Sequence, residues 1–472
     1  MTFLSMKIIL IKLKKFYCHF LVTILFPRRV ITNACFSDMV LKSRRTDSLF
    51  NLDFDLTNIV DPCDMLFARQ EIFYTRRRLK KGVGNAPCNN DHIRKLEFGS
   101  IDLIFQYLFN FYFDAGYWPA AWRMVTVFPL IKGGDRNAWD PGDYRGISIA
   151  PTFGKFFEKL IYQRLLCECG HRIDNSQGGG RAQNGSIQQI IRVVEEVQTK
   201  VSFCDHDSGD HNAVALALLD VSKAFDKFNR HVLINKMICM GVHGKLLTCL
   251  ISYFHDRRQR VRVDNAYSDI LVTNNGGPQG SVITLFAWLV YINDLATESG
   301  SALFVDDVAL WLSCPSGTDL VSKINCELHR VYNWSVLNSV VFDFSKFHMF
   351  DLGKQGLPTG SRAKIFFGDD NPPSAKYLGV ILDDKLSFVK MMNNVHSRLV
   401  SRGWRLFNHT GRTSGADPRT LENIFKIWIL PVIEYGSPIW IFRIRDFRCF
   451  HIDAPILGKY LRVLSVNLIN FT

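Results

Sequence analysis

The stretch Ser301-Ala-Leu-Phe-Val-Asp-Asp-Val-Ala-Leu-Trp-Leu312 places two adjacent acids, Asp306 and Asp307, between two apolar runs. Valine, phenylalanine, leucine and tryptophan favour strands and aspartate favours turns, so the stretch predicts a β-hairpin with both acids at its tip. Two like charges held side by side repel each other, and a divalent cation would neutralise them because hard cations bind carboxylate oxygens. A solvated surface turn is the alternative interpretation, and for an isolated Asp-Asp pair it is the commoner one.

A further acid follows another apolar run. Residues 213–219 are continuously apolar and lead into Asp220, a pattern typical of a buried strand that delivers the acid at its end. Carboxylates from separate strands of one sheet can hold two Mg²⁺ ions, the arrangement that clamps attacking and leaving oxygens in phosphoryl transfer. Asp220, Asp306 and Asp307 are therefore the predicted metal ligands.

The composition predicts a globular protein with a polyanionic partner. The chain has 472 residues, 47% of them hydrophobic, and a formal net charge of +13. Basic residues cluster at 76–81 and 257–262, and such clusters favour nucleic acid or an acidic membrane as partner, although each is equally typical of a solvated face. The 12 cysteines include no Cys-x-x-Cys pair, so we expect neither a zinc site nor a disulfide framework, even where Cys167 and Cys169 adjoin His171.

Residues 1–75 are the least informative part of the chain and stay unassigned. Basic residues precede the apolar run from Phe16 to Phe26, which is too short to span a bilayer. This order weakly resembles a signal peptide, but no small-residue cleavage site follows. We expect an irregular leader here rather than a targeting or anchoring segment.

From residue 79 onward the hydrophobic periodicity predicts a mixed α+β fold. Helices are expected at 101–113, 156–166, 187–197, 232–240, 282–295, 319–337, 395–406 and 421–428, and strands at 124–131, 213–219, 267–272, 348–352 and 376–382. The helix at 156–166 is clearly amphipathic, with a polar face made of Glu158, Lys159, Gln163 and Arg164.

Several sequence blocks together resemble the reverse transcriptases of non-LTR, LINE-type retrotransposons, and are similar to jockey-like mobile elements. In the family's order, the blocks are Asp220-Val-Ser-Lys-Ala-Phe-Asp226, Gly276-Gly-Pro-Gln-Gly-Ser-Val282 with Tyr291-Ile-Asn-Asp-Leu295, Phe304-Val-Asp-Asp307, Lys376-Tyr-Leu-Gly379, and Leu430-Pro431 through Tyr435-Gly436 with Trp440. Each block alone is only moderately specific, whereas the set in order is very specific.

The resemblance implies a right-hand polymerase fold, with fingers, a palm of antiparallel sheet plus helices, and a helical thumb. The corresponding regions are 76–212 for the fingers, 213–352 for the palm with the catalytic core, 353–394 for a palm–thumb connection with a primer-grip-like block, and 395–472 for a thumb-like region.

The resemblance also implies roles for single residues in the catalytic centre. Asp220 and Asp306 would be the principal ligands of two Mg²⁺ ions, with Asp307 beside them and Mn²⁺ as a possible substitute. Phe225 would stack under the incoming sugar and exclude a ribose 2′-hydroxyl, although an aromatic residue here is as typical of a core. Lys346 would protonate the leaving pyrophosphate, and a plain surface lysine is the alternative.

Further residues would contact the nucleic acid and the nucleotide. Gln279 and Gly280 would lie against the template and the nascent base pair, where glycine lets backbone approach closely. Lys132, Arg145 and Arg181 are candidates for holding the triphosphate, because arginine and lysine bind phosphate oxygens. Their alternative is a solvated basic loop.

The implied reaction is attack of a primer 3′-hydroxyl on the α-phosphate of a dNTP, templated by RNA. The expected partners are an RNA template, a DNA primer, dNTPs and the element RNA, with no membrane partner, and the family acts in the nucleus or cytoplasm. Base pairing would read the sequence, so the protein needs only to bind the nucleic-acid backbone, which suits the positive charge.

Some positions depart from the family pattern. Gly180 stands where a phenylalanine usually precedes the arginine, Gly146 replaces a proline, residues 283–285 are Ile-Thr-Leu, and Val305 replaces alanine. The blocks are also preceded by too few residues for an endonuclease domain and followed by no Cys/His knuckle or ribonuclease H domain, so we expect a truncated element. A catalytically decayed remnant that only binds nucleic acid is therefore the alternative to an active RNA-directed DNA polymerase.

Overall fold

The computed structural model describes residues 63–79, 90–96, 101–133, 137, 139–181, 183–202, 213–295, 299–314, 320–343, 346–352, 374–407 and 417–440. All of them belong to one unit of the chain, Pro62–Thr472. The predicted leader up to residue 62 and the basic residues Lys80 and Lys81 lie outside the described residues. Across the described ranges, no helix is both long and apolar enough to cross a membrane.

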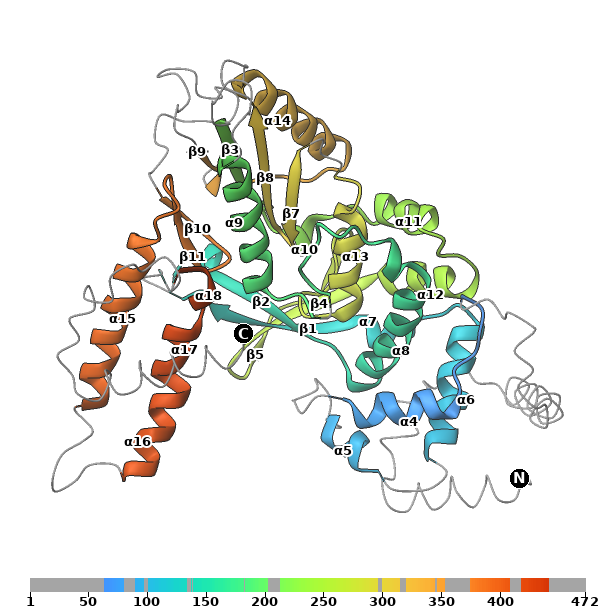
Figure 1. The fold of residues 1–472 in the computed structure, drawn as a ribbon. Coiled ribbons are helices and arrows are strands. Elements are labelled where there is room, and N and C mark those ends of the chain that lie inside the picture. The colour runs from blue at the N-terminus through green and yellow to red at the C-terminus, as the bar shows by residue number, and fades with distance from the viewer. Residues whose placement is uncertain are drawn as a thin grey trace, which may run out of the picture. The chain divides into compact units, whose positions relative to one another are not determined.

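A four-stranded antiparallel sheet carries the predicted acids. Its strand order is β7-β8-β3-β9, from β7 (Gly300–Phe304), β8 (Asp307–Cys314), β3 (Ala213–Asp220) and β9 (His348–Leu352) (Figure 1). The central strand β3 is buried over nearly its whole length, as its continuous apolar run predicts. Helices α9 (Ser186–Ser202) and α14 (Leu320–Leu337) pack against this sheet. The predicted hairpin and the predicted buried strand are therefore confirmed.

A second sheet contains two strands, at 144–149 and 257–263, that were not predicted. Its path is β2-β1-β4-β5, from β2 (Tyr144–Ile149), β1 (Met124–Ile131), β4 (Arg257–Val263) and β5 (Ala266–Tyr267), and β6 (Leu271–Thr273) also pairs with β4. The single strand predicted at 267–272 is wrong, because two short strands stand there with residues 268–270 between them. Strand β4 pairs in parallel with β1 of the predicted fingers, although the predicted bounds place it in the palm. Those bounds stay a prediction.

The basic cluster at 257–262 forms strand β4, in which Arg258 is exposed while Arg257, Arg260 and Arg262 are buried or partly buried. The Arg257 side chain is buried, donates to the Tyr253 carbonyl at 3.0 Å and lies 4.4 Å from the Tyr253 ring centroid. Arg260 lies 4.1 Å from the centroid of Tyr267. Arg257 and Arg260 thus pack on aromatic rings, and a count of charges cannot reveal this.

An aromatic core joins the helices beside the second sheet. Helices α6 (Ile101–Asp114) and α8 (Thr152–Cys169) meet at Phe109 and Phe157, whose rings are stacked with centroids 5.5 Å apart. The fully buried Trp118 packs against Phe157 and against Tyr253 of α12 (Gly244–Phe254). The remaining helices of this region are α5 (Asn90–Lys95), α7 (Ala120–Arg123), α10 (Ala224–Lys227), α11 (Arg230–Cys239) and α13 (Val282–Ile292).

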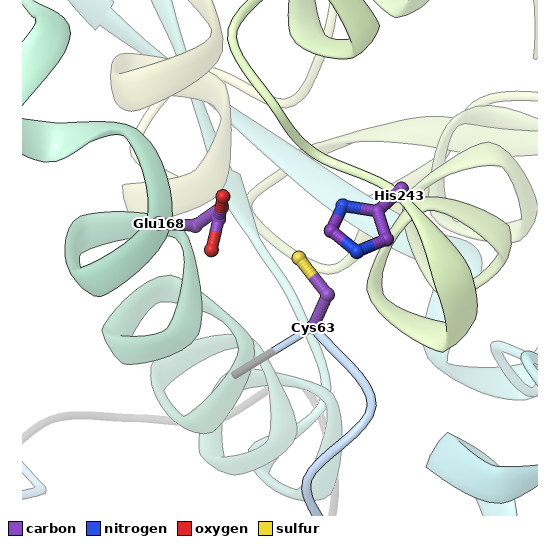
Figure 2. A group of neighbouring side chains, drawn as sticks. All are labelled: Cys63, Glu168 and His243. Carbon is purple, nitrogen blue, oxygen red and sulfur yellow. The ribbon is translucent and has the colours of Figure 1, made fainter. Parts of the chain in front are cut away.

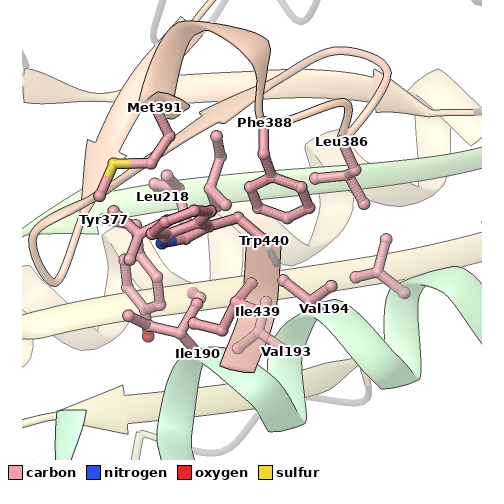
Figure 3. Packing of buried hydrophobic residues seen from close by; sticks show 14 of the residues in the cluster. Ile190, Val193, Val194, Leu218, Tyr377, Leu386, Phe388, Met391, Ile439 and Trp440 are labelled. Atoms are coloured by element: carbon pink, nitrogen blue, oxygen red, sulfur yellow. The ribbon is translucent and has the colours of Figure 1, made fainter. Parts of the chain in front are cut away.

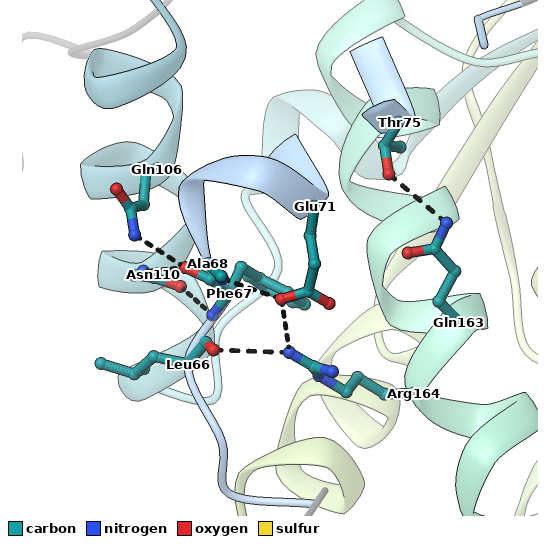
Figure 4. Close-up of polar contacts among 9 residues, drawn as sticks. All are labelled: Leu66, Phe67, Ala68, Glu71, Thr75, Gln106, Asn110, Gln163 and Arg164. Carbon is teal, nitrogen blue, oxygen red and sulfur yellow. Dashed lines mark hydrogen bonds and ion pairs between the residues drawn. The ribbon is translucent and has the colours of Figure 1, made fainter. Parts of the chain in front are cut away.

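Polar side chains of α6 and α8 bind the segment that leads into α4 (Arg69–Arg77) (Figure 4). The Phe67 carbonyl accepts hydrogen bonds from Gln106 and Asn110, each at 3.0 Å. Arg164 forms a 2.9 Å ion pair with Glu71. The predicted polar face of α8 is therefore not simply solvated, because part of it contacts α4.

The basic cluster at 76–78 also has a structural member. Arg76 is 2% exposed, and its guanidinium pairs with the Asp102 carboxylate at 2.6 and 3.1 Å. The same guanidinium donates to three backbone carbonyls between residues 93 and 96. Arg76 therefore ties α4 to α6 and is not available to a nucleic acid.

The strand predicted at 376–382 is a hairpin instead. Strands β10 (Ser374–Tyr377) and β11 (Val380–Asp383) pair through a turn in which Leu378 and Gly379 both have positive φ, 45° and 90°. The elements that follow are α15 (Val389–Phe407), α16 (Pro418–Ile424), a π-helical turn at Phe425–Ile429, α17 (Leu430–Glu434) and α18 (Ser437–Trp440).

One apolar cluster joins this C-terminal region to the first sheet. Figure 3 shows Trp440 among the side chains of Ile190 and Val194 from α9, Leu218 from β3, and Phe388. At the turn of the β10–β11 hairpin, the Tyr435 hydroxyl donates to the Leu378 carbonyl. The two C-terminal blocks of the family resemblance therefore meet each other.

Candidate active site

The first sheet brings the predicted acids to one end. Asp220, the last residue of β3, is the register partner of Asp307, the first residue of β8. Asp306 stands in the turn before β8, and its carbonyl accepts a hydrogen bond from Val221 at 3.1 Å. Lys346 Nζ forms an ion pair with Asp220 and lies 3.4 Å from the Asp343 carboxylate. The hairpin thus presents its acids to a neighbouring acid and a lysine.

The turn that carries Asp306 is held in an unusual backbone conformation. Val305 has φ +62°, a left-handed value that a β-branched residue rarely adopts. Its N–H donates to Gln177 Oε1 at 3.1 Å, and its carbonyl accepts from Trp288 Nε1 at 2.8 Å. The side chains of Gln177 and Trp288 thus fix the turn that carries the acids. Neither role was predicted from the sequence.

The glycine run at 178–180 packs against the same turn. A Cβ at Gly179 would lie 2.6 Å from the Val305 nitrogen, so only glycine fits there. Gly180 has φ +71°, and a Cβ would stand 3.1 Å from Leu289. A phenylalanine at Gly180, as in the family pattern, would be strained in this backbone. The run of three glycines was the sequence signal for this close approach.

Burial and mutual repulsion both disfavour ionisation of Asp306 and Asp307. Burial, together with the charges of Asp306 and Asp220, raises the pKa of Asp307 to about 7. Burial and the charge of Asp220 also raise the pKa of Asp306. Desolvation lowers the pKa of Lys346, but its attraction to Asp220 and Asp343 outweighs this and raises that pKa above its usual value. A cation bound by the carboxylate oxygens would stabilise their ionised form, and such oxygens suit a hard divalent metal.

The glycine-rich turn at 276–280 lies between α10 and β2. The Gly277 N–H donates to the Phe225 carbonyl at 2.9 Å, and Ser148 N–H donates to the Gln279 carbonyl at 2.9 Å. Gly280 has φ +106°, and a Cβ there would lie 3.6 Å from the Ser148 carbonyl. The half-buried Phe225 therefore shares a backbone contact with the turn that carries Gln279 and Gly280.

A buried carboxylate anchors the far side of this turn. Glu158, on the predicted polar face of α8, is 5% exposed and accepts hydrogen bonds from Ser281 Oγ and from Ile283 N–H. Tyr253 extends the network through a 2.8 Å hydrogen bond to Ser281 Oγ. Burial raises the pKa of Glu158, and the hydrogen bonds from Ser281 and Ile283 only partly oppose this rise. Periodicity alone placed Glu158 in solvent and gave no signal of this role.

The predicted phosphate-binding cations are not all near the acids. Arg145 is exposed on β2, and its positive charge offsets a small part of the rise in the pKa of Asp306, so it lies within electrostatic reach of that acid. Lys132 Nζ instead donates to the Gly142 carbonyl at 2.7 Å, in the loop between β1 and β2. Arg181 donates to the Asp174 carbonyl at 3.0 Å. The structure therefore brings Arg145 toward the acids and ties Lys132 and Arg181 to their own loops.

Comparisons with known proteins agree with this site. A family model described as reverse transcriptase (RNA-dependent DNA polymerase) matches residues 132–382. The chain is 27% identical over 395 residues to a probable RNA-directed DNA polymerase from transposon X-element of Drosophila melanogaster, covering 80% of this chain and 41% of that protein. It is 26% identical over 381 residues to the RNA-directed DNA polymerase from mobile element jockey of the same organism, covering 77% and 40%. The chain thus spans about two fifths of the length of these relatives.

Solved structures similar to this chain include telomerases. Telomerase from Candida albicans in complex with a TWJ fragment of telomeric RNA aligns with a TM-score of 0.38 and 11% identity, over 72% of this chain and 60% of that one. Telomerase from Candida tropicalis in the corresponding complex aligns with a TM-score of 0.38 and 11% identity, over 70% and 56%.

Proposed function

Because the chain belongs to the reverse transcriptase family, we propose that it catalyses RNA-directed DNA synthesis for a mobile element. The observation that carries this proposal is the convergence of Asp220, Asp306 and Asp307 at one end of a buried sheet. The partners would be an RNA template, a DNA primer, dNTPs and the element RNA. We further propose that it acts in the nucleus or the cytoplasm, without a membrane partner.

Reverse transcriptases depend on divalent metal ions, and we propose that this chain holds two Mg²⁺ ions, for which Mn²⁺ could substitute. Asp220 and Asp306 would be the principal ligands, with Asp307 beside them, and their carboxylate oxygens suit this metal. When bound, such ions stabilise the attacking and leaving oxygens of phosphoryl transfer. The pKa values of Asp306 and Asp307 are raised by burial first and by the neighbouring acids second, and a bound cation would counter both effects, which supports this assignment.

Lys346 would act as the proton donor to the leaving pyrophosphate. Its pKa is raised by Asp220 and Asp343, so the ammonium is protonated at neutral pH and can supply a proton. The ammonium forms an ion pair with Asp220, and it would transfer to the phosphate oxygens when a nucleotide enters.

Phe225 would select deoxynucleotides, while Gln279 and Gly280 would lie against the template strand. The Gly277 N–H donates to the Phe225 carbonyl. This hydrogen bond supports both roles, because it links the helix that carries Phe225 to the turn that carries Gln279 and Gly280. Arg145 would contact the triphosphate. Lys132 and Arg181 could do so only after leaving their present carbonyl partners.

Extension of a DNA primer on an RNA template with Mg²⁺ tests the proposal. We expect the purified chain to add dNTPs and the Asp306→Asn variant to lose extension while it still binds the primer–template. Asp91→Asn is the matched control, since Asp91 pairs with Arg94 on the surface of α5. A chain that binds the primer–template but adds no dNTP with either Mg²⁺ or Mn²⁺ would instead be a decayed remnant.

A further inference from the structure

Three side chains from distant segments converge away from the acid cluster. Cys63 precedes α4, Glu168 lies in the last turn of α8, and His243 directly precedes α12 (Figure 2). One sulfur, nitrogen or oxygen atom from each lies within 4.8 Å of the others. Figure 2 shows the Cys63 sulfur directed between the Glu168 carboxylate and the His243 ring. A thiol, an imidazole and a carboxylate form the donor set that Zn²⁺ binds in proteins.

A backbone carbonyl determines which nitrogen of the His243 ring carries the proton. The ring Nδ1 lies 2.7 Å from the Gly241 carbonyl oxygen. A carbonyl can only accept, so Nδ1 carries the proton and the ring lone pair is on Nε2. Metal-binding histidines are commonly fixed in this way, with the second ring N–H donated to a backbone carbonyl.

The backbone around Cys63 is held in place by α12 independently of any ligand. Cys63 is fully buried, and its carbonyl accepts from the Leu246 N–H at 3.0 Å. The next residue, Asp64, accepts from the Lys245 N–H at 2.8 Å. A few residues later, Phe67 is fixed by its hydrogen bonds to α6. The thiol therefore stands beside the start of α12 without needing a metal to bring it there.

We propose that Cys63, Glu168 and His243 bind a Zn²⁺ ion, with water at the remaining position on the exposed His243 side. The metal would join the segment before α4 to the end of α8 and the start of α12, and so would stabilise this junction rather than take part in polymerisation. Cys169 is not assigned as a ligand, because its thiol donates to the Leu165 carbonyl at 3.3 Å. A sequence search misses such a site because its ligands lack short spacing.

Neutralisation of the Glu168 carboxylate by Arg172 is the alternative to metal binding. The Arg172 guanidinium and the Glu168 carboxylate each lie 3.0 Å from the position of a Cβ at Gly241. If Arg172 alone neutralises Glu168, the three groups form a polar cluster without a metal. Metal binding by the full chain separates these two accounts.

Co²⁺ titration tests the site, because a thiolate bound to Co²⁺ gives a charge-transfer absorption that carboxylate ligands do not give. The full chain is titrated under reducing conditions in excess Mg²⁺, so that Mg²⁺ competes with Co²⁺ for the carboxylates of the acid cluster. We expect a thiolate–Co²⁺ band in the parent that Zn²⁺ displaces, and its loss in Cys63→Ser. The matched control is Cys167→Ser, since Cys167 is an exposed thiol next to Glu168 in sequence. Other cysteines lie outside the described residues, so the readout is the difference between these proteins.

A second variant guards against loss of folding in Cys63→Ser. His243→Ala changes an exposed side chain, so we expect native circular dichroism together with weaker Co²⁺ binding. Zn²⁺ should also raise the melting temperature of the parent and the Cys167→Ser control, but not that of His243→Ala. Equal Co²⁺ spectra for the parent, Cys63→Ser and folded His243→Ala would overturn the proposal. Primer extension is measured on the same samples, so the Zn²⁺ site and the polymerase activity can fail separately.

Discussion

Asp220 and Asp307 face each other as register partners at the end of adjacent antiparallel strands, so their carboxylates share one small region of a buried sheet. Burial is the main reason why the pKa of the Asp307 carboxyl is raised, and the negative charges of Asp306 and Asp220 add to this effect. The same pairing concentrates oxygen ligands where a cation would bind. Stability, metal binding and pH are therefore coupled at this site.

The metal-free protein should lose stability as the pH rises from about 4 to about 7. The pKa of Asp307 is raised from 3.8 to about 7, so the folded chain keeps a proton that the unfolded chain releases. This contribution is complete below the unfolded-state pKa and is lost as the pH rises through the folded-state pKa. Urea unfolding with EDTA across this range measures it. Asp307→Asn should flatten the dependence, and an unchanged slope would refute the assignment.

Phe225→Ala should relax the discrimination against ribonucleotides. Removing the ring opens the space that a 2′-hydroxyl would need, so we expect the relative incorporation of rNTPs to rise about tenfold or more, which corresponds to about 1.4 kcal/mol in the barrier. Single-nucleotide extension with a dNTP and the matching rNTP measures the ratio. Phe225→Tyr keeps the bulk and serves as the control. Equal ratios for the parent and Phe225→Ala would exclude the sugar-selecting role.

Gly379→Ala should destabilise the C-terminal region by about 1–3 kcal/mol, because it adds strain at a positive φ and a steric clash. A Cβ there would lie 2.8 Å from the Tyr435 ring, at φ +90°. Gly403→Ala in α15 is the control, since a Cβ there meets no atom within 4 Å and alanine favours a helix by up to about 1 kcal/mol. The urea concentration at the midpoint of unfolding should fall only for Gly379→Ala. Similar midpoints for the two variants would argue against the contact with Tyr435.

Asp102→Ala should cost about 3–5 kcal/mol of unfolding free energy, since it leaves the buried Arg76 guanidinium without its carboxylate partner. The control is Asp91→Ala, which removes the partly exposed pair with Arg94 and should cost only about 0–1 kcal/mol. Thermal and urea unfolding of both variants provide the comparison. A small effect in Asp102→Ala would mean that the backbone carbonyls around Arg76 suffice to hold it.

The sequence predicted the elements whose signals are local. A continuous apolar run followed by Asp220, and an Asp-Asp pair between strand-forming residues, are visible within a dozen positions, and the structure has both features. Strand β4 was missed because Arg257 and Arg260 pack on the rings of Tyr253 and Tyr267, which the periodicity of β4 itself cannot reveal. The tight turn at Gly379 depends on contact with Tyr435, so a pattern confined to 376–382 predicted one strand instead of two.

The supports of the candidate site were hidden for the same reason. Glu158 lies 123 positions from Ser281, and Gln177 lies 128 positions from Val305. Neither side chain differs in its local pattern from a solvated glutamate or glutamine. The roles of Lys132 and Arg181 likewise depend on the loops around them, which bind them to carbonyls in the unliganded chain. The division into fingers, palm and thumb stays a prediction.

The position of β3 at the centre of the first sheet has a consequence for synthesis of the chain. Both strands that pair with β3 come later in the sequence, and Lys346, which pairs with Asp220, lies 126 positions after it. During translation the most apolar strand of the sheet therefore emerges before its neighbours exist. Strands that lie so far apart in the sequence pair slowly, and the edges of β3 stay unpaired until they do. We expect the nascent chain to need chaperone protection over this interval, and the catalytic acids to assemble late in folding.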